Sequence, residues 1–121
     1  MSISLLIVDD SEFSRNMIKR SLPPGWDVVI DEASSGLEAL NYCSSLQFDV
    51  IFLDLTMPDM DGLDVLQSLG ERGYQSKIFI ISADIQSSSE QIALARGAQD
   101  FLAKPIDVDK LTAMLQRHEV L

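Results

Sequence analysis

The stretch FDVIFLDL, residues 48–55, contains the apolar run Val50-Ile51-Phe52-Leu53, which ends in a carboxylate, Asp54. A short run rich in β-branched and aromatic residues is typical of a strand buried on both faces of a parallel sheet. Asp54 then lies at the carboxyl end of the strand, where open α/β sheets bind their ligands. This position favours a chemical role for Asp54. A cap on the next helix, or a side chain that merely faces solvent, also fits the stretch taken alone.

The composition predicts one globular domain over residues 1–121. Hydrophobic residues make up 46% of the chain and charged residues 23%, which is ordinary for a folded protein. The net charge of −10 argues against nucleic acid and anionic membranes as partners, because those surfaces attract clustered Lys and Arg. The sequence has no apolar run of the roughly 20 residues that a membrane span needs and no recognisable secretion signal. The single cysteine, Cys43, cannot form an internal disulfide, so we expect a cytoplasmic protein.

Four further segments have the character of strands, and helical patterns separate them. The strands are expected at residues 4–8, 28–30, 77–81 and 100–103. The helices are expected to begin near Ser11, Ser35, Gly62, Ser87 and Asp107. Because parallel strands need a helical crossover between them, this alternation predicts a doubly wound five-stranded parallel sheet with helices on both faces.

Some helical details can be anticipated as well. Phe13 belongs to the apolar pattern of the first helix, and Leu37 to that of the second. Ser87 and Ser88 each precede a Glu or Gln by three residues, which predicts a capping box at the fourth helix. His118 is expected to be a solvated side chain near the end of the last helix.

Four of the five expected strands end in a reactive polar group. Asp9 and Asp10 follow the first strand, Asp54 the third, Ser82 the fourth and Lys104 the fifth. Because the carboxyl ends of parallel strands lie at the same edge of a sheet, these residues predict a functional site there.

The charges of these residues indicate the chemistry of the site. Two carboxylates about 4 Å apart repel by roughly 4 kcal/mol at an effective dielectric constant near 20, so three need a compensating cation. Oxygen ligands favour Mg²⁺ over Mn²⁺ or Ca²⁺, and a magnesium ion keeps positions for phosphate oxygens. Lys104 adds a positive charge for the same anion. A nucleotide cofactor is not expected, because the sequence has neither a Walker loop nor a G-x-G-x-x-G motif after the first strand. A carboxylate can accept a phosphoryl group as a mixed anhydride, and Asp54 is the single carboxylate at the centre.

These residues resemble, in order and spacing, those of the response-regulator receiver family, the phosphoacceptor domains of two-component signalling. The resemblance extends over essentially the whole chain. The matching positions are the acidic pair Asp9-Asp10, the phosphoacceptor Asp54 in FLDLTMPDMDG, the switch hydroxyl Ser82 followed by Ala83, the switch aromatic Phe101, and Lys104-Pro105. The family otherwise has threonine more often than serine at the position of Ser82.

The resemblance implies a strand order of 2-1-3-4-5 and a magnesium site. The expected ligands are Asp10, Asp54 and the backbone carbonyl of Thr56, with Asp9 assisting through water. A cis peptide bond is implied before Pro105.

The resemblance also implies a switch made of Ser82 and Phe101, in which the aromatic ring becomes buried after phosphorylation. A permanently buried Phe101 is the alternative. Thr56 and Asp84 occupy positions that the family uses to set the lifetime of the phosphoryl group.

The function implied is a phosphorylation-dependent switch that works through protein contacts. A histidine kinase or a phosphotransfer protein would phosphorylate it, a target protein would bind the phosphorylated form, and a phosphatase would reset it. We expect a monomer or a phosphorylation-dependent dimer, in the role of a chemotaxis messenger or a relay intermediate. It is not expected to be an enzyme, although it resembles a family that catalyses its own phosphorylation and dephosphorylation.

Three alternative functions fit parts of the sequence. A haloacid-dehalogenase-type phosphatase needs D-x-D-x-T, and Thr56 stands where the second acid belongs. A calcium-binding module is suggested by Asp59-Met60-Asp61-Gly62, but an EF-hand register would place Met57 at the first ligand position and Ser68 at the twelfth, which excludes it. The third is the receiver of a longer regulator with an effector domain. The chain ends soon after the last expected helix without a linker, so a stand-alone receiver is favoured.

Overall fold

The computed structural model describes residues 2–83 and 86–121, and strands alternate with helices along these residues. The strands are β1 (Ile3–Val8), β2 (Val28–Ala33), β3 (Val50–Leu53), β4 (Lys77–Ser82) and β5 (Asp100–Ala103). The helices are α1 (Glu12–Ser21), α2 (Gly36–Ser45), α3 (Gly62–Glu71), α4 (Ser87–Ala95) and α5 (Val108–Arg117). Each element expected from the sequence pattern is present.

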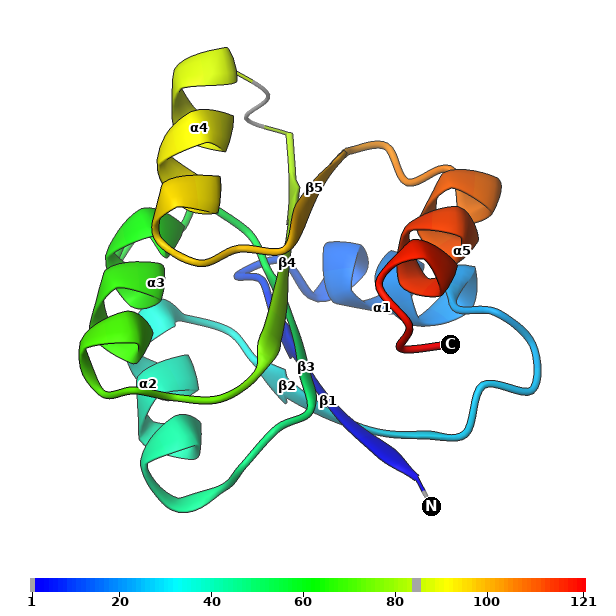
Figure 1. The fold of residues 1–121 in the computed structure, drawn as a ribbon, viewed down its shortest axis with the longest axis horizontal. Coiled ribbons are helices and arrows are strands. Elements are labelled where there is room, and N and C mark those ends of the chain that lie inside the picture. The colour runs from blue at the N-terminus through cyan, green and yellow to red at the C-terminus, as the bar shows by residue number, and fades with distance from the viewer. Residues whose placement is uncertain (1, 84–85) are drawn as a thin grey trace.

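The strands form one parallel sheet in the order β2-β1-β3-β4-β5. The doubly wound fold is thereby confirmed, as is the strand order that the family resemblance implied. Figure 1 shows α1 and α5 on one face of the sheet and α2, α3 and α4 on the other. Because helices cover both faces, the central strands read as unbroken apolar runs.

The central strand β3 contributes to both halves of the hydrophobic core. Ile51 and Leu53 pack in the cluster beneath α2 and α3, whereas Val50 and Phe52 pack in the cluster beneath α1 and α5. All four side chains are at most 1% exposed. The strand is therefore held from both sides, and the residue that follows it is placed on a rigid support.

The helices of the described residues are short. Four have ten residues and α4 has nine. Over residues 2–83 and 86–121, no helix combines the length and the apolar character that crossing a membrane requires.

Two apolar residues that the helical pattern included point away from the core. Phe13 is 75% exposed and Leu37 is 58% exposed. At 100° per residue, Phe13 lies about 140° around α1 from the buried Ile18, and Leu37 about 160° around α2 from the buried Ala39. The faces of α1 and α2 that meet the sheet include small residues, which allow close approach, and these two larger side chains lie outside those faces.

The predicted start of α4 is confirmed, but the predicted capping box is wrong. The helix begins at Ser87, and its N-cap is Gln86 rather than Ser87 or Ser88. Ser87 already has helical geometry, so it cannot serve as the extended residue that a capping box requires.

The expectation that His118 is solvated is also wrong. Its Nε2 atom lies 2.8 Å from Asp100 Oδ2, and its ring meets Phe79 edge-on at 5.3 Å between centroids. Arg117 Nη2 donates to the same Asp100 oxygen at 2.7 Å. The end of α5 folds back on the start of β5, and this tertiary contact draws the histidine out of solvent.

Candidate functional site

The polar residues that follow the strands meet at one edge of the sheet. The backbone N–H groups of Asp9, Asp54 and Lys104 donate to carbonyl groups of neighbouring strands at 2.9–3.0 Å. Parallel pairing sets Val8 beside Leu53, so Asp9 and Asp54 emerge next to each other. The hydrogen bonds between strands therefore continue one residue past the strand ends and fix the backbone of these site residues.

Asp9 is buried and surrounded by donors. Its side chain is 1% exposed. Its Oδ1 atom accepts from the Ser11 backbone N–H at 2.9 Å. Its Oδ2 atom accepts from the Ser14 hydroxyl and from Lys104 Nζ, both at 2.6 Å. Both oxygens are thus already engaged by the chain itself, which suits an indirect role toward a metal.

Asp54 is buried with weaker compensation. Burial is the main influence and raises the pKa of this carboxyl, while a hydrogen bond from Ser82 and the charge of Lys104 oppose the rise without cancelling it. Lys104 Nζ lies 3.6 Å from Asp54 Oδ2, farther than its 2.6 Å contact with Asp9. The ionised form of Asp54 therefore retains a demand for positive charge.

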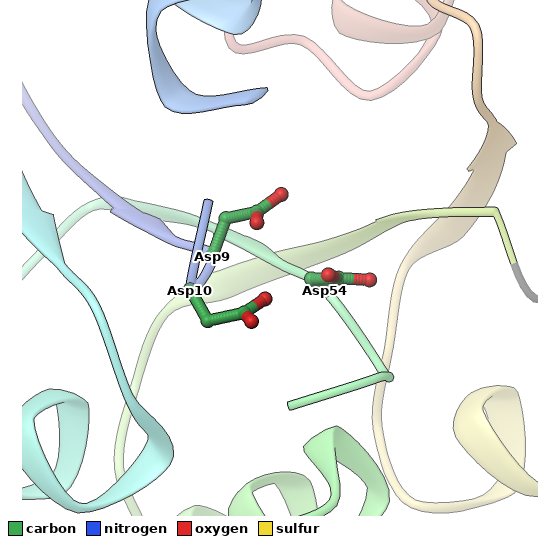
Figure 2. A group of neighbouring side chains, drawn as sticks. All are labelled: Asp9, Asp10 and Asp54. Carbon is green, nitrogen blue, oxygen red and sulfur yellow. The ribbon is translucent and has the colours of Figure 1, made fainter. Parts of the chain in front are cut away.

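Three carboxylates form a group that could hold a metal ion. Oxygen atoms of Asp9, Asp10 and Asp54 all lie within 4.8 Å of one another, and Figure 2 shows the Asp9 and Asp10 side chains extending toward Asp54. Opposite ligands of an octahedral magnesium ion are about 4.2 Å apart, so a small closure would bring these oxygens into range. Asp10 is exposed, which leaves it accessible as a direct ligand. The donor set consists of hard oxygen atoms and fits such a cation.

Thr56 lies in the loop that leads from β3 to α3. Its backbone N–H donates to Asp54 Oδ1 at 3.4 Å, a long contact. The residue is exposed. The position of the Thr56 carbonyl group relative to the carboxylates therefore depends on the contacts that the rest of the loop makes.

Sequence reasoning missed two residues that support the site, Ser14 and Arg15. The Ser14 hydroxyl binds Asp9, and Arg15 Nη1 donates to the Asp9 carbonyl oxygen at 2.7 Å. Arg15 Nε is also paired with Glu32 at the end of β2, at 2.9 Å. A signal for Ser14 existed, because a helix that begins after an N-cap at Ser11 has Ser14 in its first turn, close to the end of the first strand.

The remaining predicted residues occupy distinct places. Phe101 on β5 is half-buried and packs against the cluster beneath α2 and α3. The peptide bond between Lys104 and Pro105 is cis, as the resemblance implied. Asp84 lies outside the described residues.

Comparison with known proteins identifies similar chains. The family model for the response regulator receiver domain matches residues 5–116. The chemotaxis protein CheY of Listeria monocytogenes is 36% identical over 115 residues, which cover 95% of this chain and 97% of that protein. The response regulator MprA of Mycobacterium bovis is 35% identical over 117 residues, which cover 96% of this chain and 50% of that protein. A chain in the CheX–CheY–BeF3–Mg²⁺ complex from Borrelia burgdorferi is 30% identical and superposes with a TM-score of 0.85, covering 98% of this chain and 90% of that chain.

The raised pKa of Asp54 predicts a pH-dependent gain in stability for Asp54→Asn without metal. Above pH 3.8, the ordinary pKa of the group, the unfolded wild type loses the proton more readily than the folded protein does, so wild-type stability falls as pH rises through the raised folded pKa. We expect the variant to be more stable than the wild type at pH 7, and the gain to vanish near pH 3.

Urea unfolding in EDTA between pH 3 and pH 8 measures this difference. Asp64→Asn is the matched control, because it removes the same charge from a side chain that is 69% exposed. A gain that is the same at every pH, or an Asp54→Asn variant less stable than wild type at pH 7, would contradict the claim that burial destabilises the ionised Asp54 carboxylate.

Proposed function

The chain belongs to the response regulator receiver domain family, whose members are phosphoryl-accepting signalling switches, and we propose that Asp54 is its phosphoacceptor. The observation that carries this assignment is the position of Asp54. It follows the central strand, is 6% exposed, and has the Lys104 ammonium 3.6 Å from one oxygen and a hydroxyl donor on the neighbouring strand. Asp9 is engaged by three donors of the chain, so it is less free to act as a nucleophile.

In the proposed reaction, an Asp54 oxygen forms a bond to phosphorus while the P–N bond of a phosphohistidine breaks. The bonding electron pair returns to the ring nitrogen of the donor, which takes up a proton from water. In this proposal Lys104 and Ser82, which both contact Asp54, donate to the phosphoryl oxygens. The chain would thus catalyse its own phosphorylation, and by the attack of water its own dephosphorylation, without acting on other substrates.

We assign magnesium to the acidic group, with Asp10, Asp54 and the backbone carbonyl of Thr56 as ligands and Asp9 acting through water. When bound, the ion offsets the negative charge of the carboxylates and of the phosphoryl oxygens. The engagement of both Asp9 oxygens and the exposure of Asp10 support this division of roles.

The proposed partners are proteins. A histidine kinase or a phosphotransfer protein would supply the phosphoryl group, a target protein would bind the phosphorylated form, and a phosphatase would end the signal. The similarity to a CheY chain solved in complex with CheX, BeF3 and Mg²⁺ supports a protein partner. The net charge of −10 argues against nucleic acid and anionic membranes as partners. We also propose a cytoplasmic location, and a monomer or a phosphorylation-dependent dimer.

Relatives of two architectures are found. The match covers nearly all of the Listeria CheY and half of the M. bovis regulator MprA. The proposed reaction is the same in a stand-alone receiver and in a receiver attached to an effector domain, since all the proposed site residues lie in the matched region.

Ser82 and Phe101 are the proposed readout of phosphorylation. Ser82 is buried and hydrogen-bonds to Asp54, whereas Phe101 is half-buried. Movement of Ser82 toward the phosphoryl oxygens would open space beside Ala83, and Phe101 would fill it. Burying the rest of the ring would contribute on the order of 1 kcal/mol, which shifts a two-state equilibrium about fivefold.

Phosphorylation of Asp54 is tested with acetyl phosphate and Mg²⁺. The wild type should gain the mass of one phosphoryl group by intact-mass analysis, and Asp54→Asn should gain none, because its amide is not a nucleophile. Asp64→Asn should behave like the wild type. A phosphoryl adduct on the Asn variant under the same conditions would refute Asp54.

The metal assignment predicts that Asp10→Asn loses most of the thermal stabilisation by Mg²⁺. A ligand that binds the folded state raises stability by RT ln(1 + [L]/Kd), so the shift in Tm at 10 mM Mg²⁺ reports on binding. An equal shift in the variant and the wild type would exclude Asp10 as a ligand.

The switch predicts that Ser82→Ala is still phosphorylated but responds weakly. NMR with a beryllofluoride mimic should show smaller chemical-shift changes over residues 86–117 than in wild type. Ser21→Ala, which removes a buried hydroxyl from α1, should keep the full response. A full response in Ser82→Ala would show that the coupling does not pass through this hydroxyl.

A further inference from the structure

We propose that Asp59 is a positioning residue that fastens the loop between β3 and α3 to the first turn of α2 and so holds the Thr56 carbonyl in place for the metal. The inference rests on the proposed magnesium site. Asp59 is not a ligand, since it faces α2, and it acts through the backbone that it anchors.

The anchor consists of two hydrogen bonds between segments 22 and 23 residues apart. Asp59 Oδ1 accepts from the Gly36 backbone N–H at 3.2 Å, and Oδ2 accepts from the Leu37 backbone N–H at 3.1 Å. These hydrogen bonds, the one from Leu37 foremost, hold the pKa of Asp59 below its ordinary value. The carboxylate is therefore charged at neutral pH and matches the positive end of the α2 dipole.

The helix needs these acceptors. The first N–H groups of an α-helix have no partner within the helix, and the side chain of the N-cap of α2, Ser35, accepts from the Glu38 N–H at 3.1 Å. Asp59 supplies acceptors for Gly36 and Leu37. The start of α2 is thus capped partly by its own serine and partly by the loop of the phosphorylation site.

Close packing holds the same loop against α2. A Cβ atom added to Gly36 would lie 3.0 Å from Met60 Cβ and 2.9 Å from Val65 Cγ2. The loop therefore packs directly on Gly36 through Met60, the residue that follows Asp59. A side chain at this position would push the loop away even if Asp59 were intact.

The loop returns to the site at its other end. A Cβ atom added to Gly62 would collide with the Asp54 carbonyl oxygen, and the Gly62 N–H donates to the Leu55 carbonyl at 2.9 Å. Residues 56–61 are thus a short bridge fixed at the strand end and, through Asp59, at α2. Thr56 stands three residues before Asp59 on this bridge, so loosening the anchor lets its carbonyl move relative to the carboxylates.

The test compares Asp59→Ala with Ser35→Ala. Both variants remove acceptors from the start of α2 and should lower Tm, but only Asp59→Ala releases the loop. By titration followed with NMR, Asp59→Ala should raise the Kd for Mg²⁺ about three- to tenfold, the range expected when one or two ligand-positioning hydrogen bonds are lost. Ser35→Ala should leave the Kd within twofold of the wild-type value.

Two further variants sharpen the result. Asp59→Asn retains a single carbonyl oxygen and can accept one of the two bonds, so its Kd should fall between those of the wild type and Asp59→Ala. Gly36→Ala keeps the carboxylate but displaces Met60, and it should weaken Mg²⁺ binding in the same direction. In metal-free protein, ¹⁵N relaxation should show greater mobility of residues 56–61 in Asp59→Ala and unchanged mobility in Ser35→Ala.

The outcomes separate this inference from the proposed function. If the wild type binds Mg²⁺ and Asp59→Ala binds it equally well, or if Ser35→Ala weakens binding as much as Asp59→Ala, the positioning role is overturned and the metal site stands. If the wild type binds no Mg²⁺, both the metal site and the positioning role are overturned.

Discussion

Three carboxylate groups held within 4.8 Å of one another are the constraint on which the rest of the site depends. Each ionised pair at such a distance costs about 3 to 4 kcal/mol at an effective dielectric constant of 20. The chain offsets part of this cost with hydrogen bonds, but most of these go to Asp9, which accepts from Ser11, Ser14 and Lys104. Asp54 has a raised pKa, so its ionised form would be stabilised by a further positive charge. A bound cation would supply that charge, and it would also offset the charge of a phosphoryl group.

The fold keeps the repelling groups together by placing them on rigid backbone. Asp9 and Asp54 directly follow strands that are buried on both sides, so their main chains cannot move apart without breaking the sheet. Glycine permits close packing of the neighbouring loop, because Gly62 lies against the Asp54 carbonyl where any side chain would collide. Asp59 ties the middle of the loop to α2. Support from both core and loops thus allows the electrostatic strain to persist.

In the proposed switch, the same arrangement would transmit a local charge at Asp54 to distant parts of the surface. Ser82 and Lys104 both contact Asp54, and they stand at the ends of β4 and β5, which lead into α4 and α5. Phe101 lies on β5 and packs half-buried on the core. A phosphoryl group on Asp54 would act first on the two donors, and their movement would reach the helices through these strand ends. This is a short physical route for the switch function of the receiver family.

The local pattern of the sequence determined the elements, and it predicted which polar residues gather at one edge of the sheet. Apolar runs such as Val50 to Leu53 show burial on both faces, and the polar residues that end these runs meet because parallel strands share a carboxyl edge. The strand order came from the family resemblance, since periodicity does not specify which strands are neighbours. Only the tertiary structure decided the roles of Ser14, Arg15 and Asp59, the pairing of His118 with Asp100 and the exposure of Phe13. These depend on how elements distant in sequence approach one another, whereas periodicity along the chain reports only which side of each element is buried.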